Sequence, residues 1–173
     1  EYAGERRANL LRAAVLACFY AVELVNRHGF RPLGVLPDPS VTPEFHFAVT
    51  VLTAGWVLSC WGLLVLLRSR VFPPTLKFFT TAVDAAFLTA VLAAADGLRS
   101  PLAGGYTLLV CLAGLRMSLP LVRAAGLLCG LGACLTWLLH ASLSTRAPGY
   151  YLAIHVLSIT AAAVLVGQII RRA

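Results

Sequence analysis

Charged side chains are scarce in this chain. They make up 12% of its 173 residues, and hydrophobic residues make up 60%, whereas a soluble domain carries roughly 25% charged residues. This shortage excludes an ordinary water-soluble globule. A transmembrane helix takes about 20 apolar residues, so the length accommodates about six spans and leaves no room for a soluble catalytic domain. We therefore expect that this domain is not itself an enzyme.

Acidic residues are especially few. The chain has 7 Asp and Glu against 14 Lys and Arg, which gives a formal net charge of +7. In a soluble protein this excess would suggest a nucleic-acid partner, but in an apolar chain it is better explained by membrane topology. We expect the lipid bilayer as a partner and no nucleic acid.

Apolar runs separated by proline, glycine and charged residues predict an all-α membrane protein, a single six-helix transmembrane domain over residues 1–173. The predicted spans are about residues 8–28, 44–67, 75–95, 102–119, 124–143 and 150–170. The chain starts at Glu1 and ends at Ala173, directly after an apolar run. We expect it to be a piece of a longer protein that continues into an output domain.

The basic residues predict the orientation of the spans. With both termini in the cytoplasm, the inner side holds Arg6, Arg7, Arg12, Arg68, Arg70, Lys77, Arg123, Arg171 and Arg172, and the outer side holds Arg27, Arg31, Arg99 and Arg146. Short loops with such a bias follow the positive-inside rule. An odd number of spans would weaken the bias, so we expect six spans with both termini inside.

No cysteine falls in a predicted outer loop. All five lie within predicted spans, at Cys18, Cys60, Cys111, Cys129 and Cys134. This distribution argues against a disulfide framework and is typical of small buried core residues.

All four histidines fall at the predicted outer ends of spans. His28 ends the first span, His46 opens the second, His140 lies in the last turn of the fifth, and His155 lies early in the sixth. Polar residues inside a membrane are costly and usually face the bundle interior or a cavity. The four are therefore candidate cofactor ligands, although an interfacial role explains His28 equally well. Candidate partners for their second ring nitrogens are Glu23, Asn26, Glu44 and Tyr151.

Two chemistries match such a set of histidines. Paired imidazoles from neighbouring helices ligate haem iron axially, and three or four imidazoles hold zinc or copper. Spacing along the chain does not separate the two. We favour haem b, since four histidines make two bis-imidazole pairs, and keep a transition-metal ion as the alternative.

Two further features concern helix packing. Asp84 in the third predicted span and Arg116 in the fourth both lie in the inner halves of their spans. The sequence therefore predicts a structural ion pair between them, with a proton or ion pathway as the alternative. The Gly-x-x-x-Gly spacing of Gly126 and Gly130 predicts close helix packing, either within the chain or at a dimer seam.

Short motifs follow one another in a recognisable order. They are Glu23-Leu24-Val25-Asn26 before His28-Gly29, Phe45-His46 with Ala48-Val49-Thr50 and Trp56, Asp84, Asp96-Gly97-Leu98-Arg99-Ser100-Pro101-Leu102, and Leu115-Arg116. The order resembles the six-helix membrane anchors of bacterial signalling proteins, which precede adenylate or guanylate cyclase, histidine kinase or serine/threonine kinase domains.

More distantly, the chain resembles six-helix dihaem membrane cytochromes. That resemblance implies axial ligation by His28, His46, His140 and His155. Dihaem electron carriers usually place haems toward both leaflets, whereas these histidines share one, which argues against electron transfer across the membrane.

These features together predict a receptor or anchor domain in the bacterial inner membrane. We expect it to sense through the histidines, to signal to a cytoplasmic output domain of the same chain, and to form a homodimer. The alternatives are a b-type cytochrome or other electron carrier, a small transporter, and an assembly subunit of a larger membrane complex.

Overall fold

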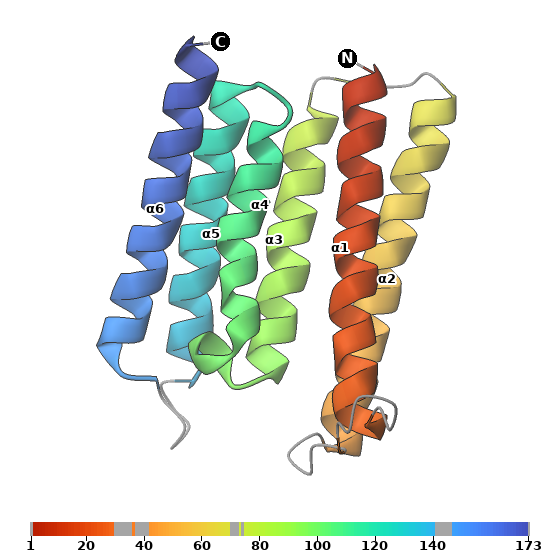
Figure 1. The fold of residues 1–173 in the computed structure, drawn as a ribbon, viewed down its shortest axis with the longest axis vertical. Coiled ribbons are helices and arrows are strands. Elements are labelled where there is room, and N and C mark those ends of the chain that lie inside the picture. Colours follow the sequence, from red (N-terminus) through yellow and green to blue (C-terminus); the bar gives the residue numbers. More distant parts are fainter. Residues whose placement is uncertain are drawn as a thin grey trace. The chain divides into compact units, whose positions relative to one another are not determined.

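The computed structural model describes residues 2–29, 36, 42–69, 73, 75–140 and 147–172. Within these ranges every regular element is a helix (Figure 1). The elements are α1 (Tyr2–His28), α2 (Pro43–Arg68), α3 (Leu76–Ala94), η2 (Gly97–Arg99), η3 (Pro101–Gly104), α4 (Gly105–Gly114), α5 (Leu119–Leu139) and α6 (Gly149–Arg172). The all-α prediction is confirmed. Among the described residues, α1, α2, α3, α5 and α6 are long and apolar enough to cross a membrane, and Pro101–Gly114 is a shorter apolar helix.

The fourth predicted span is shorter than expected. The prediction extended it to Leu119, but α4 ends at Gly114 and the chain turns through Leu115, Arg116 and Met117. Met117 has a φ of 49°, a left-handed conformation that does not continue a helix.

The fifth helix begins earlier than expected. The predicted spans of residues 102–119 and 124–143 leave Pro120 and Arg123 in the connection between them, but Pro120 stands in the first turn of α5. The first helical N–H groups have no partner within the helix, so proline is tolerated there. The prediction treated Pro120 as a break, and that interpretation was wrong.

The helices form two compact units, residues 1–71 and 72–173. In the first unit α1 and α2 pack antiparallel (Figure 1). Hydrogen bonds lie along the interface between α1 and α2, and residues later in α1 pair with residues earlier in α2. They join Asn9 Nδ2 to Cys60 O (3.0 Å), Arg12 Nη2 to Ser59 Oγ (2.8 Å), and Tyr20 Oη to Thr50 Oγ1 (3.1 Å).

In the second unit α5 packs against α3, α4 and α6. One face of α5 is buried, with Leu121, Val122, Ala125, Cys129 and Ala133 fully inaccessible. The opposite face exposes the large apolar residues Leu127, Leu131, Leu135 and Leu138. A helix that is apolar all round is typical of a membrane span.

A chain of hydroxyl groups crosses the centre of the second unit. The Tyr106 hydroxyl of α4 lies 2.8 Å from Thr89 Oγ1 of α3 and 3.3 Å from Thr136 Oγ1 of α5. Each threonine also donates to a carbonyl one turn earlier in its own helix, at Ala85 and Gly132. The buried hydroxyls are thus satisfied, as the low-polarity interior requires.

The two glycines of the Gly-x-x-x-Gly spacing have different surroundings. A Cβ placed on Gly126 would lie 3.3 Å from Cβ of Ala163 in α6, whereas one on Gly130 would meet no atom within 4 Å. Gly126 therefore serves packing within the chain.

Candidate functional site

The structure divides the four histidines between the two units. His28, in the last turn of α1, and His46, in the first turn of α2, belong to the first unit. His140, the residue after α5, and His155, in α6, belong to the second. Convergence of all four in one site stays a prediction.

His28 and His46 lie close together at one end of the α1–α2 pair. Their ring centroids are 6.0 Å apart and their planes meet at 83°. Imidazoles that share one metal ion each bind at about 2.0 Å through a ring nitrogen, so the two rings lie close enough to share an ion.

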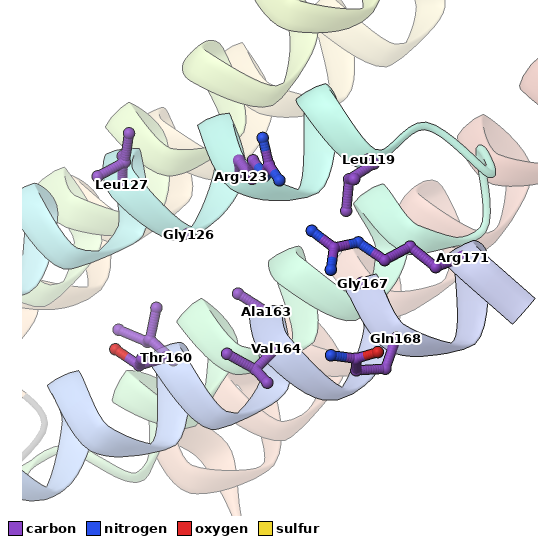
Figure 2. A pocket seen from close by; sticks show the side chains of 11 residues that line it. Leu119, Arg123, Gly126, Leu127, Thr160, Ala163, Val164, Gly167, Gln168 and Arg171 are labelled. Atoms are coloured by element: carbon purple, nitrogen blue, oxygen red, sulfur yellow. The ribbon is translucent and has the colours of Figure 1, made fainter.

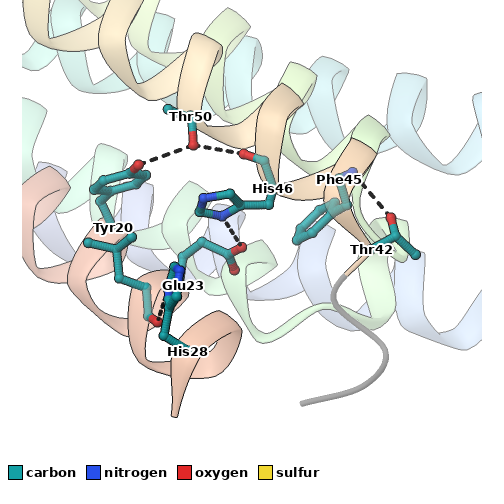
Figure 3. Close-up of polar contacts among 8 residues, drawn as sticks. Tyr20, Glu23, His28, Thr42, Phe45, His46 and Thr50 are labelled. Carbon is teal, nitrogen blue, oxygen red and sulfur yellow. Dashed lines mark hydrogen bonds and ion pairs between the residues drawn. The ribbon is translucent and has the colours of Figure 1, made fainter. Parts of the chain in front are cut away.

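Glu23 fixes the ring of His46. Its Oε1 lies 3.3 Å from His46 Nδ1, and the side chains of His46 and Glu23 are 23% and 12% exposed (Figure 3). An ionised carboxylate only accepts hydrogen bonds, so Nδ1 carries the proton and Nε2 of a neutral imidazole keeps its lone pair. A carboxylate in this position is the usual second partner of a metal-ligating histidine. Glu23 was a predicted candidate for this role.

A backbone carbonyl orients the ring of His28. His28 Nδ1 lies 3.2 Å from the carbonyl oxygen of Leu24, so here too Nδ1 is the donor and Nε2 is left as an acceptor. Gly29 then ends α1 with a φ of 71°, and its N–H donates to Val25 O at 2.7 Å. Glycine adopts this left-handed conformation without strain, which places His28 in the final turn.

Local capping sets the position of His46. Thr42 accepts a hydrogen bond from the N–H of Phe45 at 3.2 Å, and Pro43 follows as the first helical residue. The Thr50 hydroxyl donates to His46 O at 2.8 Å and also pairs with Tyr20 (Figure 3). Sequence reasoning missed Tyr20 and Thr50. Their signal was the spacing, since Tyr20 lies three residues before Glu23 and Thr50 four after His46, each on the same helix face as its neighbour.

The histidines of the second unit contact backbone carbonyls of the turn that follows α3. His140 Nδ1 lies 2.9 Å from Thr136 O, and its Nε2 lies 3.0 Å from Ala95 O, just after α3. His155 Nε2 lies 3.2 Å from Leu98 O in the same turn. The Ala95 and Leu98 carbonyls follow the end of α3, where helical partners are lacking, so the histidines cap them. A neutral His140 donates to one of its two carbonyls, and the imidazolium form donates to both.

The second pair therefore differs from the first as a ligand set. In this conformation both nitrogens of His140 and Nε2 of His155 face carbonyl oxygens, whereas among the described residues Nε2 of His28 and of His46 makes no such contact. Over the described ranges, no group of three or more His, Cys, Asp and Glu residues is placed to hold a metal ion. Two imidazoles are the number that a bis-histidine haem iron takes from a protein, because the macrocycle supplies its other nitrogens.

Arg116 lies against the start of α3. Its Nη1 is 3.1 Å from Lys77 O, 3.3 Å from Thr80 Oγ1 and 3.4 Å from Thr81 Oγ1. Asp84, which is 6% exposed, follows one turn later in α3. This places Arg116 beside the face of α3 that carries Asp84, and the ion pair itself stays a prediction.

Comparison with known proteins gives no relative. No protein family, curated protein or solved structure matches the chain.

Proposed function

We propose that this chain is the membrane-embedded sensing domain of a bacterial signalling protein in the cytoplasmic membrane. Its sensing site is the end of the α1–α2 pair that carries His28 and His46. The observation that supports this most directly is the orientation of the two imidazoles, with Nδ1 of each held by an acceptor. Such a preset orientation lowers the cost of binding a ligand between the rings.

The ligand that this pair suits is haem b, with a transition-metal ion as the second choice. When bound, a haem iron held by two imidazoles would supply a reversible one-electron change. The chain's part is to orient the rings through Glu23 and Leu24 O.

Sensing requires that the ligand favours one packing of α1 against α2 over another. Binding with equal affinity to both packings would shift nothing, however tight it is. Because His28 and His46 belong to different helices of the pair, occupancy acts directly on the angle and register between them. The proposed receiver is a cytoplasmic output domain of the same protein, and a gene that ends directly after Ala173 would contradict this part.

Removal of either imidazole is expected to abolish cofactor binding. The purified chain should show a Soret band with sharp α and β bands on reduction, or a stoichiometric metal by elemental analysis. His46→Ala and His28→Ala should each lose it, and Glu23→Gln should weaken binding about 10- to 100-fold as a positioning residue.

The control variant for this experiment is His155→Ala, which removes a histidine of the second unit. Retention of the cofactor in this variant confines the site to the first unit, and loss extends it to the four-histidine site expected from the sequence. A wild-type chain without colour and without metal would contradict the proposal. Reversible reduction together with electron transfer between partners on the two sides of the membrane would favour the electron-carrier alternative.

The proposed topology has six spans with both termini in the cytoplasm. In a variant whose native cysteines are replaced by serine or alanine, Ser40→Cys, which lies outside the described residues, should react with an impermeant maleimide in intact cells. Ser69→Cys, directly after α2, should react after permeabilisation and not before. Labelling of Ser69→Cys but not Ser40→Cys in intact cells would invert the topology.

A further inference from the structure

A groove with a volume of about 570 Å³ runs along the seam between α5 and α6 (Figure 2). Its floor consists of small residues, Gly126 of α5 with Ala163 and Gly167 of α6. A Cβ on Gly167 would lie 3.2 Å from Leu119 Cδ1, and the one on Gly126 would meet Ala163 as described above. The two helices therefore approach closely and leave a depression on their outer side.

The walls of the groove are mostly apolar and exposed, with Thr160 and Gln168 as the polar lining residues besides the arginines. Leu127 is 70% exposed and Val164 is 55% exposed, and both line it. From Leu119 to Leu127 the groove follows nine residues of α5, whose eight intervals extend about 12 Å at a rise of about 1.5 Å per residue. An apolar channel of this shape on the outside of a membrane bundle matches an extended alkyl chain.

One end of the groove is positively charged. Arg123 of α5 and Arg171 of α6 line it, both are exposed, and no carboxylate is among the lining residues. Figure 2 shows the Arg171 side chain running back from its backbone toward the level of Leu119 and Gly167. In the part of the chain that the structure describes, neither guanidinium forms a hydrogen bond or an ion pair.

Two such guanidinium groups beside an apolar groove favour the binding of an anion. A charge near the hydrocarbon region is costly unless it is paired or reaches the headgroups. Arginine binds phosphate oxygens through two parallel N–H donors, and basic pockets between transmembrane helices bind anionic headgroups.

We propose that the α5–α6 groove is a binding site for an anionic glycerophospholipid. The lipid phosphate binds Arg123 and Arg171, and one acyl chain lies over Gly126 and Ala163 between Leu127 and Val164. This site lies in the second unit and does not depend on the proposed sensing function.

Charge disfavours a second copy of this chain as the occupant. A two-fold dimer formed through this groove would bring the Arg171 side chains of both copies, and the Arg123 side chains with them, into one apolar interface. Like charges in such surroundings repel strongly, whereas a phosphate neutralises them.

Native mass spectrometry of the intact chain in detergent tests the site. Titration with phosphatidylglycerol should give one retained lipid at lower concentration than titration with phosphatidylcholine. The double variant Arg123→Gln/Arg171→Gln should bind phosphatidylglycerol on the order of ten-fold more weakly. The double lysine variant, which keeps both charges, should retain most of the preference, and circular dichroism should show the same helix content in all variants.

Arg172→Gln is the matched control, because Arg172 is the neighbouring exposed arginine and does not line the groove. It should bind phosphatidylglycerol like the wild type. An equal loss in this variant, or no loss in the double glutamine variant, overturns the proposal. Competition by inorganic phosphate at millimolar concentration would point to a free anion site instead. Disulfide formation between two copies at Val164→Cys, in the presence of phosphatidylglycerol, would assign the groove to a dimer.

Discussion

Replacement of Gly132 by alanine is expected to destabilise the second unit by about 1–3 kcal/mol, and replacement by valine by more. A Cβ at this position would lie 2.5 Å from Thr89 Oγ1, 2.9 Å from Tyr106 Oη and 3.0 Å from Tyr106 Cε1. Neither neighbour moves aside easily, because both belong to the hydroxyl chain that joins α3, α4 and α5. Any shift large enough to admit a methyl group lengthens those hydrogen bonds.

The measurement is the free energy of unfolding in mixed micelles, with SDS as denaturant and circular dichroism as readout. Gly130→Ala is the matched control in the same helix, since a Cβ there meets no atom within 4 Å. It should be neutral or slightly stabilising, because alanine favours a helix more than glycine does. Equal stabilities of Gly132→Ala and Gly130→Ala would contradict the close packing around Tyr106.

Arg116→Ala is expected to cost about 1–3 kcal/mol from its lost hydrogen bonds, and about 3–5 kcal/mol where a buried ion pair is lost with them. The substitution removes three contacts with α3, at Lys77 O, Thr80 and Thr81. If Asp84 is the ionic partner, the substitution also takes away the cation that stabilises a buried carboxylate.

A double-mutant cycle with Asp84→Asn isolates the ionic part. Arg116→Ala should cost less in the Asp84→Asn background, with a coupling energy above about 1 kcal/mol. Arg172→Ala, an exposed arginine at the end of α6, should change the stability by less than about 0.5 kcal/mol. Additive effects of the two substitutions would show that Arg116 acts through the threonines and the carbonyl alone.

Helices with unambiguous end signals could be predicted closely from the sequence. The predicted span of residues 44–67 differs from α2 by only one residue at each end. The start was predictable because Thr42 and Pro43 are typical residues for the first positions of a helix. The start of α5 could not be predicted in the same way. Proline both ends helices and occupies their first turn, and what decides between the two at Pro120 is the turn at Met117, which has no signal in the sequence.

The part of the candidate site that lies on α1 and α2 was predictable from the sequence. Two antiparallel helices joined at one end bring the last turn of the first beside the first turn of the second. His28 and His46 are therefore neighbours, and Glu23, five residues before His28, contacts His46. The contacts of His140 and His155 were not predictable. They depend on the path of η2, where Gly97 takes a φ of 62° beneath the His140 ring.

The shortness of α4 sets a condition on the surrounding lipid. Together η3 and α4 extend about 23 Å, given about 2.0 Å per residue in a 3₁₀ helix and about 1.5 Å in an α-helix, whereas a typical hydrocarbon core is about 30 Å thick. One stripe of this segment, Gly104, Leu108 and Cys111, is exposed. As one of the six proposed spans, this segment would be matched by thinning of the bilayer around it, at a cost of a fraction of a kcal/mol per ångström of mismatch. This side of the protein would therefore favour short or disordered acyl chains. The cost of mismatch would be highest in thick membranes with long acyl chains or sterols.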